Sequence, residues 1–180
     1  MAHIPPGDSE CLEGWSRNYY KVVNRFADTI KAQFFGHVHT DGFIVFYEDM
    51  NNFRSKPTNV LYTAPSVTTF ENLNPAYRMY TIDGNYNGSS YEVYDFETYF
   101  LNLTETLDTD QLQWKLLNSF CVQGWHNLSE QIRTNETMFE TFLENHTRNN
   151  NYQCDDSCHK EILCSMRRGH HNETALCPTN

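Results

Sequence analysis

The sequence has no long hydrophobic run and no excess of positive charge. No segment approaches the roughly 18 apolar residues that a membrane-spanning helix requires. The 13 lysine and arginine residues are outnumbered by 23 aspartate and glutamate residues, which gives a formal net charge of −10. Because an acidic chain repels a phosphate backbone, the composition argues against nucleic acid as a partner. Hydrophobic residues still make up 39% of the 180 residues, enough to build a core.

The opening residues, MAHIPPGDSECLEG, lack the basic start and the apolar stretch of a signal peptide. The rest of the sequence nevertheless has features of the secretory pathway. Four of the 6 cysteines lie between residues 154 and 177. The Asn-X-Ser/Thr sequons, each a candidate N-glycosylation site, begin at Asn87, Asn102, Asn127, Asn135, Asn145 and Asn172. Clustered cysteines and this many sequons indicate an oxidising, glycosylating compartment, so we expect that Met1 is not the biological start.

Apolar periodicity predicts a sheet-rich first part and a helical second part. A helix is expected over residues 13–32, where apolar side chains recur at three- and four-residue steps. Short strands are expected over residues 33–37, 42–48, 59–68, 77–84 and 91–103. From about residue 105 the pattern becomes helical, with Leu112, Leu116 and Phe120 on one stripe and a further helix around residues 138–143. We therefore place a boundary near residue 105.

The cysteine-rich tail has two interpretations. Cys154 and Cys158 are four residues apart, and Cys164 and Cys177 are thirteen apart. Small oxidised modules use such cysteines as disulfide bridges. A zinc knuckle is the competing interpretation, with His159, His170 and His171 as further ligands. The sequons in the same region favour disulfides.

The stretch QFFGHVHTDGF places two histidines, His37 and His39, after an apolar pair and a glycine. Imidazole is a good neutral ligand for zinc. In an extended segment, residues i and i+2 point the same way, so both rings could face one metal, or each could serve one of a pair. Gly36 allows a sharp turn or a close approach to a ligand. An H-x-H pair alone is also common among surface histidines, but His3 in HIPPG adds a third candidate ligand.

The order of HIPPG, WSRNYY and QFFGHVH resembles acid sphingomyelinases, a family of the calcineurin-like metallophosphoesterase superfamily. Residues 64–104 are similar to that family's A-P-S-x-T-T, L-N-P-x-Y-R, I-D-G-N-Y and E-T-Y-x-L-N-L-T runs. Residues 124–128, GWHNL, and the cysteine spacing of the tail also agree. The resemblance covers essentially the whole chain and corresponds to the C-terminal half of the family.

The resemblance implies an α+β fold, an α/β sandwich. Residues 1–105 would be the C-terminal part of the metallophosphoesterase domain, and residues 106–180 a helical, cysteine-rich subdomain. The family's active site holds two zinc ions. By similarity His3 and His37 would bind one and His39 the other, while Tyr86 would lie near the substrate head group unless it is only a packed aromatic in a turn. The resemblance further implies disulfides between Cys154 and Cys158 and between Cys164 and Cys177.

The implied activity is hydrolysis of sphingomyelin, a membrane lipid, to ceramide and phosphocholine by a secreted or lysosomal phosphodiesterase. In the family the remaining ligands (a D-x-H segment, an aspartate and an asparagine) and the proton donors precede HIPPG, so we expect this chain alone to be inactive. Cys11 is expected to lack its family partner, and its pairing with Cys121 stays open. The alternatives are a related phosphodiesterase acting on nucleotides or other lipids, and a non-catalytic secreted glycoprotein that binds lipid surfaces.

Overall fold

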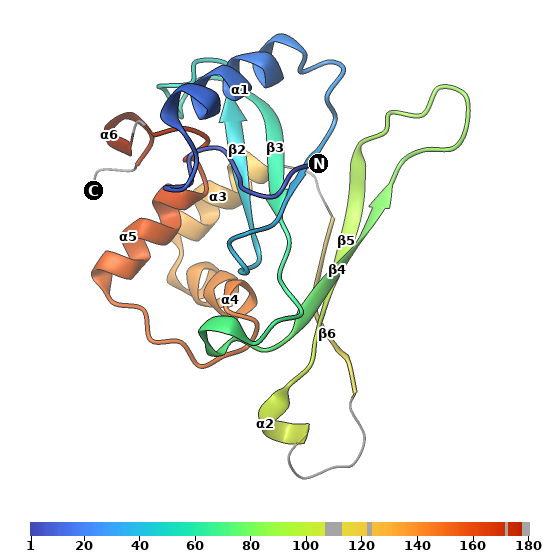
Figure 1. Cartoon of the computed structure of the whole chain (residues 1–180), viewed down its shortest axis with the longest axis vertical. Coiled ribbons are helices and arrows are strands. Elements are labelled where there is room, and N and C mark those ends of the chain that lie inside the picture. Colours follow the sequence, from blue (N-terminus) through green and yellow to red (C-terminus); the bar gives the residue numbers. More distant parts are fainter. Residues whose placement is uncertain (107–112, 122–123, 172, 178–180) are drawn as a thin grey trace.

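The computed structural model describes residues 1–106, 113–121, 124–171 and 173–177. It is a mixed α/β fold with two small sheets and several helices (Figure 1). The first sheet has the order β1-β3-β2 and the second the order β4-β5-β6. The strands are β1 (Gln33–Phe35), β2 (Gly42–Tyr47), β3 (Pro57–Thr63), β4 (Ala76–Ile82), β5 (Val93–Phe100) and β6 (Lys115–Cys121). The helices are α1 (Glu13–Arg25), η1 (Phe70–Asn72), α2 (Leu103–Thr106), α3 (Trp125–Thr134), α4 (Glu136–His146), α5 (Asp156–Ser165) and α6 (Glu173–Leu176).

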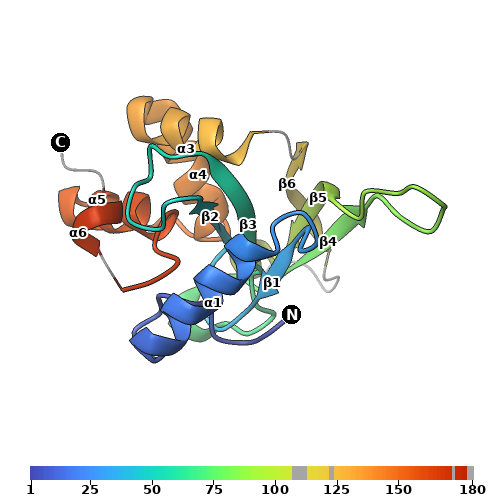
Figure 2. The same ribbon diagram turned by 90° about the horizontal axis from the view of Figure 1, so that it is seen from above.

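Strand β2 is buried on both faces because helices cover both sides of the first sheet. Figure 2 shows α1 on one side of β2 and β3, with α3 and α4 on the other. Ile44 and Phe46 pack in a cluster with Tyr20 of α1. Phe43 and Val45, which point the opposite way, pack in a cluster with residues of α3, α4 and α5. A continuous apolar strand of this kind is typical of a sheet enclosed between helical layers.

The second sheet is antiparallel, and its β4–β5 hairpin extends away from the body of the molecule (Figure 1). The guanidinium of Arg78 on β4 is 1% exposed and donates to the carboxylate of Asp41, which is itself 8% exposed. Asp41 also joins the end of α4, because its amide donates to the carbonyl of His146 at 3.2 Å. A buried ion pair therefore links the second sheet to the loop that follows His39.

Two expectations about helices are wrong. The first helix ends at Arg25, not at residue 32. The helical pattern from residue 105 onward does not hold for Lys115–Cys121, which forms β6 and pairs with β5. Leu116, expected on one apolar stripe of a helix, lies instead on β6 and is 51% exposed, and Leu112 lies outside the described residues. The free edge of β5 supplies hydrogen bonds that override the local helical period. The boundary near residue 105 stays a prediction.

The tail is closed by disulfides, as expected. Cys154 is bonded to Cys158 with the α-carbons 5.3 Å apart, and Cys164 to Cys177 with the α-carbons 4.4 Å apart. The zinc-knuckle interpretation is wrong, because none of these cysteines is a free thiolate. The three tail histidines have other contacts. The ring of His159 packs against that of Phe139 in a tilted contact, and His170 and His171 approach the backbone carbonyls of Met50 and Asp8. No helix in the described ranges is long and apolar enough to cross a bilayer.

Candidate metal and substrate site

His3 and His37 lie together at the end of β1. The N-terminal segment runs beside this strand, since the amide of Ala2 donates to the carbonyl of Phe34 at 3.1 Å and the amide of Gly36 donates to the carbonyl of His3 at 3.0 Å. The rings of His3 and His37 then meet edge to face, with their centroids 5.2 Å apart. A β-carbon on Gly36 would lie 3.4 Å from His3 Nδ1, an ordinary contact, so the need for glycine at this position stays a prediction.

His37 and His39 both have left-handed backbone conformations, with φ of +73° and +59°. The expectation of an extended segment is wrong beyond Phe35, where β1 ends. The left-handed turn therefore falls on the histidines and not on the glycine. His39 turns toward Phe70, with ring centroids 5.5 Å apart, while His37 faces His3. Non-glycine residues with strained backbones of this kind are enriched at ligand-binding sites. The two rings therefore lie in a turn typical of such sites, but they face different neighbours.

Two carboxylates lie beside His37. Asp8 Oδ1 is 3.9 Å and Glu10 Oε2 is 3.6 Å from its Nε2. The loop that carries them is held by hydrogen bonds, because the amide of Asp8 donates to Pro5 and its carbonyl accepts from Cys11. These residues were not among the sequence candidates. The acidic run DSE, directly after HIPPG, was the available signal.

The donors present fit part of a zinc site. His3 and His37 could offer two imidazole nitrogens to one ion, with negative charge nearby. Within the described ranges, no group of three or more His, Cys, Asp or Glu side chains is arranged to hold a metal. Structural zinc sites have four protein ligands and catalytic sites three. The cluster is therefore half of a ligand set at most.

Tyr86 lies in the β4–β5 connection, where a hydrogen bond to Asp83 holds its side chain. Its hydroxyl donates to one carboxylate oxygen of Asp83, and the amide and hydroxyl of Ser90 donate to the other, each at 2.7 Å. These bonds lower the pKa of Asp83, and the same carboxylate raises the pKa of Tyr86. Tyr86 is 59% exposed, so it is not a packed aromatic. Among the described contacts, none joins it to His3 or His37.

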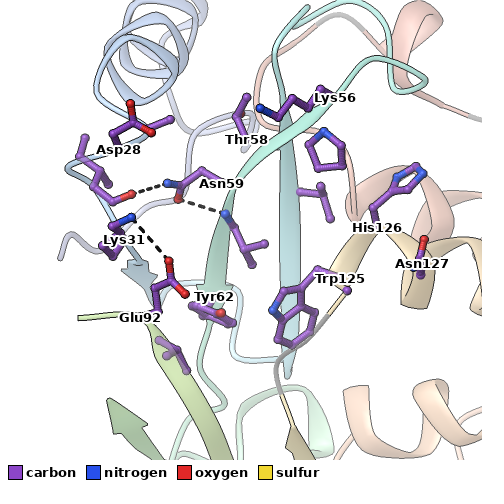
Figure 3. A pocket seen from close by; sticks show the side chains of 17 residues that line it. Asp28, Lys31, Lys56, Thr58, Asn59, Tyr62, Glu92, Trp125, His126 and Asn127 are labelled. Carbon is purple, nitrogen blue, oxygen red and sulfur yellow. Dashed lines mark hydrogen bonds and ion pairs between the residues drawn. The ribbon is translucent and has the colours of Figure 1, made fainter. Parts of the chain in front are cut away.

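A cavity of about 650 Å³ lies elsewhere, where the segment that follows α1, strand β3 and the start of α3 meet (Figure 3). The ion pair between Lys31 and Glu92, at 3.5 Å, spans one side of it. Trp125 and His126 form the opposite side, and His126 Nδ1 lies 3.2 Å from the hydroxyl of Tyr47. None of the three candidate zinc ligands lines this cavity.

The sequons differ in how open their asparagines are. Asn87, Asn127 and Asn135 are exposed, whereas Asn102 and Asn145 are partly buried. Asn172 lies outside the described residues, as does the side chain of Cys121. Cys11 is a free thiol. Glycosylation at these sequons stays a prediction.

No family model matches the sequence. The chain is 47% identical to sphingomyelin phosphodiesterase 1 of Caenorhabditis elegans over 99% of its length, and 41% identical to human sphingomyelin phosphodiesterase over 98%. It is 31% identical to sphingomyelin phosphodiesterase B of Dictyostelium discoideum over 93%. The chain spans about a third of these relatives, covering 33%, 29% and 28% of their lengths. The chain is therefore homologous, along nearly its whole length, to about a third of the length of the sphingomyelin phosphodiesterases it matches.

Proposed function

We propose that this chain is the C-terminal part of a zinc-dependent phosphodiesterase that hydrolyses sphingomyelin to ceramide and phosphocholine. One observation carries the proposal. A chain homologous to sphingomyelin phosphodiesterases over 99% of its length brings together the imidazoles of His3 and His37, which are far apart in sequence. Imidazoles beside carboxylates suit a divalent cation and do not suit an anionic ligand.

His3 and His37 would hold one zinc ion, and His39, which turns the other way, would contribute to a second. Bound zinc would activate water and stabilise negative charge on the phosphate oxygens. Asp8 and Glu10 would favour the cation by placing negative charge beside Nε2 of His37. Tyr86, held by Asp83, would contact the substrate head group.

The ligand inventory supports a further point, that these 180 residues are inactive alone. Three imidazoles divided between two ions leave each ion short of a working ligand set. Titration of the chain with zinc in a calorimeter tests this. We expect weak binding, with a dissociation constant above about 1 μM. Tight binding of two ions per chain would contradict the proposed inactivity.

The activity is tested on the longer protein that contains this chain. His37→Ala and His39→Ala should each reduce sphingomyelin hydrolysis by about 100-fold or more, because each removes a proposed direct ligand of a zinc ion that activates water. His126→Gln, at the separate cavity, is the matched control and should retain activity. A nucleotide phosphodiester assayed in parallel distinguishes the related-enzyme alternative, and faster hydrolysis of that substrate would reject sphingomyelin as the preferred one. Equal activity of all three variants would reject the zinc assignment.

We also propose that the longer protein is secreted or lysosomal. The two disulfides support an oxidising compartment. Immunolocalisation of the tagged full-length protein tests the location, and a cytosolic distribution would reject it. Flotation of the 180-residue chain with sphingomyelin vesicles tests the alternative of a non-catalytic lipid-binding glycoprotein. Stable flotation without hydrolysis by the longer protein would favour that alternative.

A further inference from the structure

A polar groove lies beside α2, the helix at the lower end of the molecule in Figure 1. Its volume is about 460 Å³, within the range of ligand pockets. Three segments that are distant in sequence form its walls, residues 69–74, 102–105 and 149–151. Among the eleven described residues that line it, six are asparagines, namely Asn72, Asn74, Asn102, Asn149, Asn150 and Asn151. Amide side chains both donate and accept hydrogen bonds, so the groove suits a neutral ligand rich in hydroxyl and amide groups.

Hydrogen bonds between the segments hold the groove open. Asn74 bridges two walls, because its Nδ2 donates to the carbonyl of Arg148 at 3.0 Å and its Oδ1 accepts from the amide of Leu103 at 3.2 Å. Asn150 Nδ2 donates to the carbonyl of Asn72 at 2.8 Å. In contrast, the side-chain amides of Asn72 and Asn149 make no hydrogen bond with any other described residue. The groove therefore has a fixed frame and unused polar groups.

One wall is itself a sequon. Asn102 is partly buried, and its Oδ1 accepts from the amides of Thr104, at 3.1 Å, and Glu105, at 3.4 Å. Its Nδ2 donates to Glu105 Oε1 at 3.1 Å, which uses one of two hydrogens. N-glycosylation replaces one of these two hydrogens. One hydrogen therefore remains on Nδ2 to donate to an acceptor such as Glu105 after a sugar is attached.

We propose that the groove is the seat of the N-glycan on Asn102, with the first N-acetylglucosamine packed against its asparagine walls. The bond forms between Nδ2 and the anomeric carbon of the sugar. Nδ2 loses one proton, and the pyrophosphate of the lipid-linked oligosaccharide donor departs. Asn72 and Asn149 hydrogen-bond the sugar hydroxyls and N-acetyl group, while Leu103 contacts the acetyl methyl group. This inference goes beyond the phosphodiesterase and does not depend on it.

The test measures how fast a peptide N-glycosidase removes each glycan. The chain is directed through the secretory pathway of a eukaryotic host, and glycopeptide mass spectrometry follows Asn102, Asn87 and Asn135. In the folded protein the Asn102 glycan should be released about tenfold or more slowly than the two exposed ones, because release requires local opening. After denaturation the three rates should be equal. An Asn102 without a glycan, or one released as fast as the others, would overturn the proposal.

Matched variants separate the groove from general stability. Asn72→Gly and Asn149→Gly remove the unused amides and keep left-handed backbones, at φ of +60° and +55°. Each should speed release at Asn102 by about fivefold, since about 1 kcal/mol of hydrogen bonding corresponds to that factor. Asn85→Gly, at φ +66° in another loop, is the control and should leave the rate unchanged. Equal effects of all three would contradict a seat in the groove.

Loss of the glycan at Asn102 should also lower the thermal stability of the protein, whereas loss of the glycan at Asn87 should not. Thr104→Ala abolishes the Asn102 sequon but keeps both backbone amides that donate hydrogen bonds to Asn102 Oδ1. We expect Tm to fall by about 2–4 °C. Ser89→Ala abolishes the exposed Asn87 sequon and should not change Tm. A Thr104→Ala protein as stable as the Ser89→Ala protein would count against the proposal.

Discussion

Gly7 lies directly against the backbone carbonyl of Arg168, where a β-carbon would collide with the oxygen. Its φ of +87° is also in the region that favours glycine. Gly7 ends HIPPG and precedes Asp8, so this contact places the loop between His3 and the first acidic neighbour of His37. We expect Gly7→Ala to lower the free energy of unfolding by about 2 kcal/mol or more.

The measurement is urea unfolding followed by circular dichroism, with Gly14→Ala as control. Gly14 lies in the first turn of α1, where an added β-carbon meets nothing within 4 Å. Alanine is a better helix former than glycine, so this control should be neutral or stabilising by up to about 1 kcal/mol. Similar destabilisation of both variants would show that the Arg168 contact is not the cause.

Arg78 and Asp41 form a buried pair whose loss should be expensive. Arg78 Nε also donates to Thr98 Oγ1 at 3.0 Å, and the guanidinium lies 3.9 Å from the ring centroid of Phe96. Arg78→Met would leave the carboxylate of Asp41 buried without its partner, and we predict a loss of about 3–5 kcal/mol in calorimetric unfolding. Lys115→Met breaks an exposed pair and should cost less than about 1 kcal/mol. Equal losses would refute the distinction.

His146 should make stability depend on pH. Its Nδ1 lies 2.6 Å from the carbonyl of Asp41, and burial lowers the pKa of its imidazole to about 4. The unfolded chain has the ordinary pKa of about 6.5 and so binds the proton more readily. The contribution of neutral His146 to the free energy of unfolding is therefore fully present above pH 6.5. It is lost as pH falls toward 4, by up to about 3 kcal/mol.

Urea unfolding at about pH 7, 5.5 and 4.5 measures this loss. His146→Gln retains a hydrogen-bonding side chain that does not titrate, so the difference in stability between the two proteins should shrink as pH falls. The nearby Asp41 and Arg78 are present in both proteins, and subtraction removes their titration. Parallel pH curves would exclude His146 as the titrating group.

The two disulfides should contribute unequally. The Cys164–Cys177 bridge closes a longer loop than the Cys154–Cys158 bridge, with separations of 13 and 4 residues. Loop-closure entropy predicts losses of about 3 and about 2 kcal/mol when each pair is replaced by serine. Thermal unfolding of the two double variants tests the order, and the reverse order would show that loop entropy does not dominate here.

Local patterns in the sequence were sufficient for most of the sheet. The apolar run at residues 42–48 predicted β2, which the structure has as Gly42–Tyr47. Met138, Phe139 and Leu143 predicted the helix observed as Glu136–His146. The clustered cysteines predicted an oxidised tail. In each case the information lies within a few residues, because strand and helix periods and short loops are local properties.

By itself, the sequence determined the similarity to sphingomyelin phosphodiesterases, the candidate histidines and the oxidised tail, all of which depend on the order of residues. Only the tertiary structure decided the state of Lys115–Cys121, since a strand edge on β5 supplies hydrogen bonds that no local pattern contains. It also decided that His37 meets His3 while His39 turns to Phe70. A two-residue spacing sets direction only in an extended chain, and this backbone is held left-handed by its surroundings.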